Sequence, residues 1–124
     1  MLKYLNLLIG GAIGTVCRYS LSGFIYKIWG SAFPYGTLVV NLLGCLIAGF
    51  LLAITEKKLL LGPNIRLLLM IGFCGAFTTF STFILETASL MRDEQVMRTF
   101  INLLISVTLG FFALRAGIIL GEAI

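Results

Sequence analysis

The sequence predicts an all-α membrane protein with four transmembrane helices, forming a single domain over residues 1–124. Of the 124 residues, 60% are hydrophobic and only 11% are charged. A soluble domain of this size cannot bury so much apolar surface. The charged residues also lie between long apolar runs, which is typical of membrane spans. The net charge of +4 comes from single basic residues at the ends of these runs, which indicates a lipid bilayer as partner and no nucleic acid.

Short connectors separate the four expected spans. The spans cover roughly residues 4–26, 36–55, 67–91 and 99–120. Each has about 20 residues, enough to cross about 30 Å of hydrocarbon as a helix. Tyr26, Trp29 and Tyr35 flank the first connector, where interfacial aromatic residues are common.

The third span contains an unusual uncharged segment, GFCGAFTTFSTF, at residues 72–83. Gly72 and Gly75 weaken a helix, and Thr78 and Thr79 are β-branched, so we expect the third helix to break near its middle. Carbonyl groups near Gly75 and Thr78 would then lose their helical partners, which hydrocarbon does not tolerate. Converging carbonyl oxygens of this kind suit a desolvated hard cation.

The same segment carries groups that suit a small anion. Phe80 and Phe83 are three residues apart and share one helix face, and the edge of an aromatic ring is electropositive. The amide of Asn41 in the second span supplies an N–H donor, and Ser81 and Thr82 supply hydroxyls. Because none of these groups is charged, the anion would be held weakly, and an ion must leave a channel as readily as it enters.

Small and polar residues also form stripes at helical spacing on two other spans. In the second span they are Thr37, Asn41, Gly44, Cys45 and Ala48, and in the fourth they are Asn102, Ser106 and Gly110. One stripe alone is explained by close helix packing. Two stripes together with the third-span segment favour a shared polar lining.

The first span combines two glycines with a charge. Gly10 and Gly14 have the G-x-x-x-G spacing of closely packed helices. Arg18 is the only charged residue well inside this span. A central arginine costs roughly 2.5–3.5 kcal/mol on insertion scales, so we expect its side chain to reach the interface or meet carbonyl groups at a protein contact.

Three segments resemble the signature blocks of the Fluc (CrcB) fluoride channel family. They are GGAIGTVCRY (10–19), GTLVVNLLGC (36–45) and GFCGAFTTFSTF (72–83). The resemblance covers essentially the whole chain. It implies a passive, fluoride-selective channel that exports fluoride across a bacterial inner membrane. It also implies a four-helix subunit that assembles as an antiparallel, dual-topology homodimer with two pores.

The resemblance further implies roles for individual residues. Asn41, Phe80 and Phe83 match the residues of the fluoride pathway, and Ser81 and Thr82 match the hydroxyls beside the helix break. The backbone carbonyls of the glycine and threonine of the third block match the ligands of a central structural sodium ion, and these residues are here Gly75 and Thr78.

The remaining assignments are electrostatic or concern the fourth span. Arg18 matches the arginine of the first block, and Glu86 matches a glutamate one turn beyond the phenylalanines. The family often has tyrosine in the polar track of the fourth span, where this chain has Asn102, Ser106 and Gly110. As a member of this polar stripe, Ser106 is included among the expected residues of the fluoride pathway.

The sequence supports other functions less well. A small multidrug exporter of similar size needs a membrane carboxylate for proton coupling, but the first span has no acidic residue and the chain has no histidine. An assembly subunit without a transport role would explain the glycines but not three polar spans. Enzyme activity is not expected, because no nucleophile–base pair or metal-ligand cluster is apparent.

The basic residues predict how the subunit inserts. With four spans, both termini and the connector at 56–66 share one side of the membrane. That side has Lys3, Lys57, Lys58, Arg66 and Arg115, and the other side has Lys27, Arg92 and Arg98. Arg115 lies within the expected fourth span, and without it the bias is four against three; Arg18 is left out because it lies inside the first span. Because orientation follows the loop excess of Lys and Arg, so balanced a chain is expected to insert both ways, as an antiparallel dimer requires.

Overall fold

The computed structural model describes residues 1–56 and 61–124, and every regular element in these ranges is a helix. The elements are α1 (Leu2–Trp29), α2 (Tyr35–Glu56), α3 (Pro63–Arg66), the π-helix η1 (Leu67–Cys74), α4 (Gly75–Phe77), α5 (Ser81–Arg92) and α6 (Val96–Ala123). The elements from α3 to α5 follow one another in a single rod. Four rods are long and apolar enough to cross a membrane, which confirms the four expected spans. Lys57 and Lys58, counted in the charge balance, lie outside the described residues.

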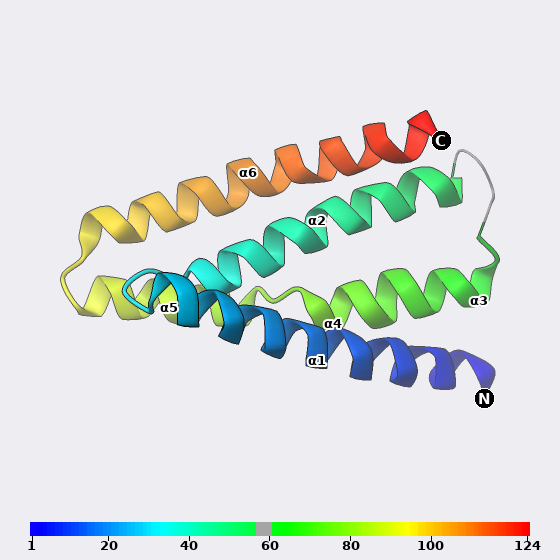
Figure 1. Ribbon diagram of the computed structural model, residues 1–124, viewed down its shortest axis with the longest axis horizontal. Coiled ribbons are helices and arrows are strands. Elements are labelled where there is room, and N and C mark those ends of the chain that lie inside the picture. Colours follow the sequence, from blue (N-terminus) through cyan, green and yellow to red (C-terminus); the bar gives the residue numbers. More distant parts are fainter. Residues whose placement is uncertain (57–60) are drawn as a thin grey trace.

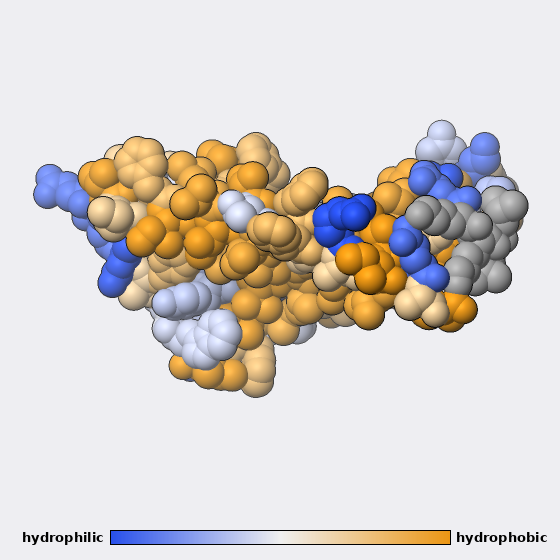
Figure 2. All heavy atoms as spheres, turned by 90° about the horizontal axis from the view of Figure 1, so that it is seen from above, coloured by the Kyte–Doolittle hydropathy of each residue, from blue (hydrophilic) through white to orange (hydrophobic). Residues whose placement is uncertain are grey.

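The four rods lie side by side, and each runs antiparallel to the next in the chain (Figure 1). Both termini lie at the same end of the bundle as α3, as four spans require (Figure 1). The most extensive packing joins α2 to α6, and the next joins α1 to η1. Figure 2 shows that apolar residues cover most of the upper face, with hydrophilic residues gathered mainly toward the two ends.

The helices extend a few residues beyond the expected spans at most ends, because hydropathy locates the hydrocarbon layer and not the helix termini. Backbone chemistry sets these termini. Gly30, with a φ of 78°, ends α1, and its N–H donates to the carbonyl of Tyr26 at 2.9 Å. Pro63 begins α3, where its missing N–H leaves no helical hydrogen bond unmade.

Glycines bring the rods close together. A Cβ on Gly10 or Gly14 would overlap backbone atoms of η1, so the G-x-x-x-G pair makes the expected close contact, and it does so within the same chain. A Cβ on Gly49 or Gly117 would likewise overlap backbone atoms across the α2–α6 contact. In lipid there is no hydrophobic driving force between helices. The close approach of small residues therefore supplies much of the packing energy.

The third rod is broken at residues 78–80, between α4 and α5. Thr78 is extended, with φ −84° and ψ 158°. The break lies near the middle of the third span, as expected, and Gly75, one of the residues expected to weaken the helix, is itself still helical. The N–H of Thr78 still donates to the carbonyl of Cys74 at 3.0 Å, so Thr79 is the first residue whose N–H makes no helical hydrogen bond and donates to Asn41 instead.

Asn41 of α2 satisfies the backbone at the break. Its Nδ2 donates to the carbonyl of Thr79 at 2.9 Å, and its Oδ1 accepts from the N–H of Thr79 at 2.8 Å. The Thr79 hydroxyl accepts from the N–H of Thr82 at 3.2 Å, which caps the first turn of α5. The side-chain amide of Asn41 therefore pairs with both backbone groups of Thr79, as a peptide unit of a neighbouring strand does in a sheet. Because these groups are satisfied, the break can lie within the membrane.

The π-helix η1 directly precedes α4 and was not expected from the sequence. Its wider turns pack against α1, where Gly72 lies against the Cα of Gly10. π-Helical turns are rare and often lie near functional sites.

Replacing Asn41 by leucine, which has a similar shape, should lower the free energy of unfolding by about 2 kcal/mol, because it orphans both backbone groups of Thr79. Thermal unfolding in detergent measures the change. Asn64→Leu, at an exposed position near the start of α3, is the matched control and should have little effect. Equal melting temperatures for the two variants would contradict the role of this pair.

Candidate functional site

A groove of about 480 Å³ runs between α2, the third rod and α6. It brings together most of the site residues expected from the sequence, namely Asn41, Gly75, Thr78, Phe80, Phe83 and Ser106. The break places them there, because it turns the chain between α4 and α5 and starts a new helix at Ser81. No charged side chain is among the described residues that line the groove.

The two phenylalanines occupy different environments. Phe83 is 7% exposed and belongs to the first turn of α5, whereas Phe80 lies in the break and is 75% exposed. Their ring centroids are 6.0 Å apart and the rings are tilted by 51°. An aromatic ring this exposed at mid-span lacks its full packing within one chain.

The side-chain amide of Asn41 has fewer groups available to a ligand than the sequence suggested. One hydrogen of its Nδ2 is donated to Thr79, and its Oδ1 accepts from the same residue. A primary amide carries two N–H groups, so one donor is left for a ligand. The fixed amide also gives that donor a defined direction.

The carbonyls of Gly75 and Thr78 accept no backbone hydrogen bond from the described residues, because the donors that would normally reach them are used elsewhere. The N–H of Thr79 goes to Asn41, and the N–H of Thr82 goes to the Thr79 hydroxyl. Neutral oxygens of this kind fit the donor set of a hard cation. Within the described ranges no three His, Cys, Asp or Glu side chains gather to hold a metal.

Ser81 and Thr82 do not line the groove. Ser81 is exposed at the start of α5, and the Thr82 hydroxyl accepts from the Thr79 hydroxyl at 3.1 Å. Arg18 is half-buried in α1, and its side chain makes no hydrogen bond or ion pair with the part of the chain described here.

The stripe on α6 divides between packing and the groove. Asn102 is 1% exposed and donates to the Thr87 hydroxyl of α5 at 2.9 Å, so it joins two helices. Ser106 lines the groove, and its hydroxyl donates to Asn102 Oδ1 at 3.4 Å, a long bond that leaves it free to turn. Gly110 lies near the sulfur of Cys45 on α2.

Glu86 lies outside the groove and lines a second cavity of about 900 Å³ at the end where α1 meets α2. Its Oε1 accepts from the Tyr26 hydroxyl at 2.7 Å. This contact could not be predicted from the sequence, since the two residues are 60 positions apart. Thr79 and Thr87 were also missed as partners of Asn41 and Asn102, for the same reason.

The chain is similar, over nearly its whole length, to a family model and to several curated proteins. A family model described as CrcB-like protein, camphor resistance (CrcB), matches residues 5–118. Three relatives are each described as a fluoride-specific ion channel, FluC. That of Desulforapulum autotrophicum is 48% identical over 98% of both chains. That of Solidesulfovibrio magneticus is 46% identical over 94% of this chain and 93% of the relative. That of Maridesulfovibrio salexigens is 42% identical over 100% of this chain and 98% of the relative.

These matches agree with the resemblance carried by the three sequence segments, and with the four membrane-spanning rods. The protein is a multi-pass membrane protein, as expected from its composition. It belongs to the CrcB-like family.

Proposed function

We propose that this protein is a passive, fluoride-selective channel of a bacterial inner membrane through which fluoride leaves the cell. The observation that carries the proposal is the uncharged groove beside the helix break, lined by Phe80, Phe83 and the amide of Asn41. The names of the relatives support fluoride as the ion.

The groups of the groove suit a small anion that must move on. The electropositive edges of Phe80 and Phe83, the second N–H of Asn41 and the hydroxyl of Ser106 each offer a weak contact. A fixed cation in the groove would hold fluoride too tightly for rapid release. Weak, dispersed donors therefore favour conduction over storage.

The proposal includes an antiparallel homodimer with a structural sodium ion at its centre. One chain offers the carbonyls of Gly75 and Thr78, which are fewer oxygens than a hard cation takes. A second copy related by a two-fold axis in the membrane plane would supply an equal pair. It would also cover Phe80, whose ring is largely exposed in one chain.

A proton-coupled exporter of the small multidrug type is less well supported. Such an exporter needs a carboxylate in its substrate path. Glu86 is the acidic residue well inside a described span, and it is hydrogen-bonded to Tyr26 outside the groove.

The decisive experiment is ion efflux from liposomes that contain the purified protein. Fluoride should leave electrogenically, at a rate insensitive to an imposed pH gradient, while chloride leaves far more slowly. Empty liposomes are the control. Equal chloride flux, or strict coupling to protons, would refute the proposal.

Phe80→Ile and Phe83→Ile should each slow fluoride efflux about tenfold or more, because isoleucine keeps apolar bulk but lacks the electropositive ring edge. Phe112→Ile, at an exposed position of α6 away from the groove, is the matched control and should conduct normally. Unchanged flux in folded variants of both groove residues would remove the rings from the pathway.

Removing sodium should slow or stop fluoride flux without unfolding the protein, because the ion would order backbone carbonyls and not hold the bundle together. Efflux in sodium-free N-methylglucamine buffer, with a thermal melt of the same sample, measures both effects. Full activity without sodium would show that the cation is dispensable.

Labelling of single cysteines in intact cells tests the dual topology, after Cys17, Cys45 and Cys74 are replaced by serine. Ser31→Cys and Asn64→Cys mark opposite ends of the bundle. Each should react with an impermeant reagent in about half of the molecules, as expected for nearly balanced loop charge. Labelling of one position only would exclude an antiparallel dimer.

A further inference from the structure

Tyr26 makes a contact that its place at the end of the first span does not suggest. The sequence favours an interfacial aromatic residue, but the side chain is half-buried and its hydroxyl donates to Glu86 Oε1 at 2.7 Å. This short bond joins α1 to α5 across the end of the bundle. Hydrogen bonds to a charged acceptor are among the stronger ones in proteins.

The packing around Tyr26 is shaped for its ring. A Cβ on Gly36 would lie 2.6 Å from Tyr26 Cε2 and 2.8 Å from Cζ, so only glycine at this position of α2 leaves room for the ring. The ring thus packs against the first residues of α2, and its hydroxyl reaches Glu86 on α5.

Thr37 directs the Tyr26 hydroxyl. The two oxygens are 3.4 Å apart, and Thr37 is buried. The single hydroxyl proton of Tyr26 points to Glu86, so Thr37 is the donor in this pair. At this distance the bond is weak, and the Tyr26–Glu86 bond is the principal one.

Glu86 depends on Tyr26 for its position. Its Oε2 is buried and has no hydrogen-bond partner among residues 1–56 and 61–124. Arg92 lines the same cavity, but its Nη2 donates to the Ser89 hydroxyl at 3.4 Å. Among the described residues, the Tyr26 hydroxyl is therefore the one donor to this carboxylate.

The carboxylate lies one helical turn from the candidate ion path. Phe83 lines the groove, and Glu86, three residues further along α5, lines the cavity beside Tyr26 and the connector between α1 and α2. Side chains three residues apart on a helix are neighbours at about 5–6 Å. A carboxylate turned toward Phe83 would place a negative charge beside any anion there.

We propose that Tyr26 is a positioning residue that holds the Glu86 carboxylate on the α1–α2 side of α5, so that its charge does not repel the anion in the groove. The inference rests on the function proposed above and adds a residue of α1 to it. Without the tyrosine hydroxyl, the buried carboxylate has no donor and turns toward water and the ion path.

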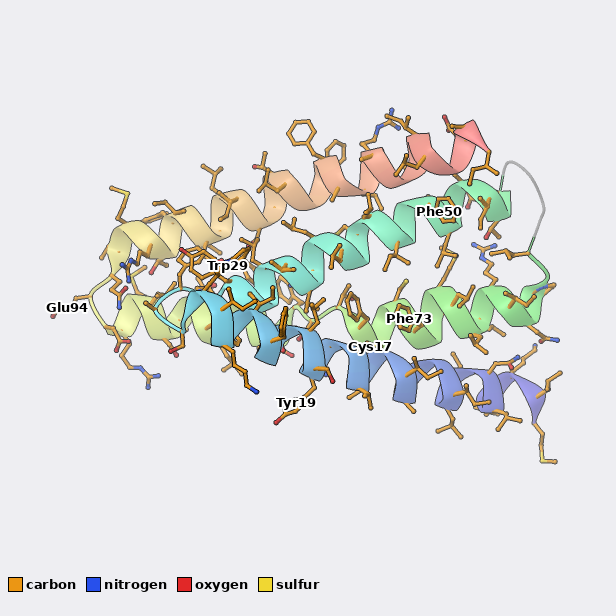
Figure 3. The ribbon with its side chains drawn as sticks, in the orientation of Figure 1. Cys17, Tyr19, Trp29, Phe50, Phe73 and Glu94 are labelled. Carbon is orange, nitrogen blue, oxygen red and sulfur yellow. The ribbon has the colours of Figure 1, made fainter. Side chains whose placement is uncertain are left out.

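Fluoride efflux in three variants tests this role. Tyr26→Phe keeps the ring and should conduct at least roughly tenfold more slowly than the wild type, the effect of one uncompensated charge at this distance. Glu86→Gln should conduct at about the wild-type rate. The double variant Tyr26→Phe/Glu86→Gln should regain that rate, because the charge is gone. Tyr19→Phe, whose side chain points away from the bundle (Figure 3), is the matched control.

Each other outcome overturns the inference. A normal rate in Tyr26→Phe shows that the hydroxyl is not needed, and a double variant as slow as Tyr26→Phe shows that the tyrosine acts through packing alone. An inactive Glu86→Gln shows that the carboxylate itself is required. If Tyr26→Phe does not fold, Thr37→Val replaces it, with a smaller loss that Glu86→Gln must also reverse. Absence of fluoride efflux in the wild type refutes the proposed function instead.

Discussion

The structure depends on the pairing between the side chain of Asn41 and the backbone of Thr79. A membrane helix normally satisfies its own N–H and C=O groups, and hydrocarbon offers no substitute. Here one amide replaces the lost partners of a single residue at 2.8 and 2.9 Å. The third rod can therefore stop after Phe77 and start again at Ser81 without leaving Thr79 unsatisfied.

The other features of the groove follow from this pairing. Because the N–H of Thr79 is committed to Asn41, the carbonyl of Gly75 is left for another ligand. Because α5 starts afresh at Ser81, Phe83 comes to the groove from its first turn, and Phe80 comes from the break just before it. The position of Asn41 depends in turn on the packing of α2. Glycines at the α2–α6 contact allow these two helices to lie close together. The ring of Tyr26 packs against Gly36 of the same helix. Helix α2 therefore contacts both the residues of the break and the tyrosine that is hydrogen-bonded to Glu86.

The sequence predicted the parts of this arrangement that depend on local composition. Four apolar runs gave the four rods, and the glycines and threonines of residues 72–83 gave a broken helix. It predicted the break only to the middle of the span, since glycine weakens a helix but the loss of a hydrogen bond decides where the helix ends. It gave no sign of η1, because a π-turn reflects packing against α1 and not propensity. The bond between Tyr26 and Glu86 joins residues distant in the chain, which helix periodicity does not relate.

A structure of the protein in lipid, solved with sodium and fluoride present, tests this account most directly. It should show the third rod interrupted at residues 78–80, with both amide atoms of Asn41 paired to Thr79 and ion density in the groove beside Phe80 and Phe83. A helix continuous through Thr79, or an Asn41 amide turned away from it while ions still occupy the groove, would contradict the account.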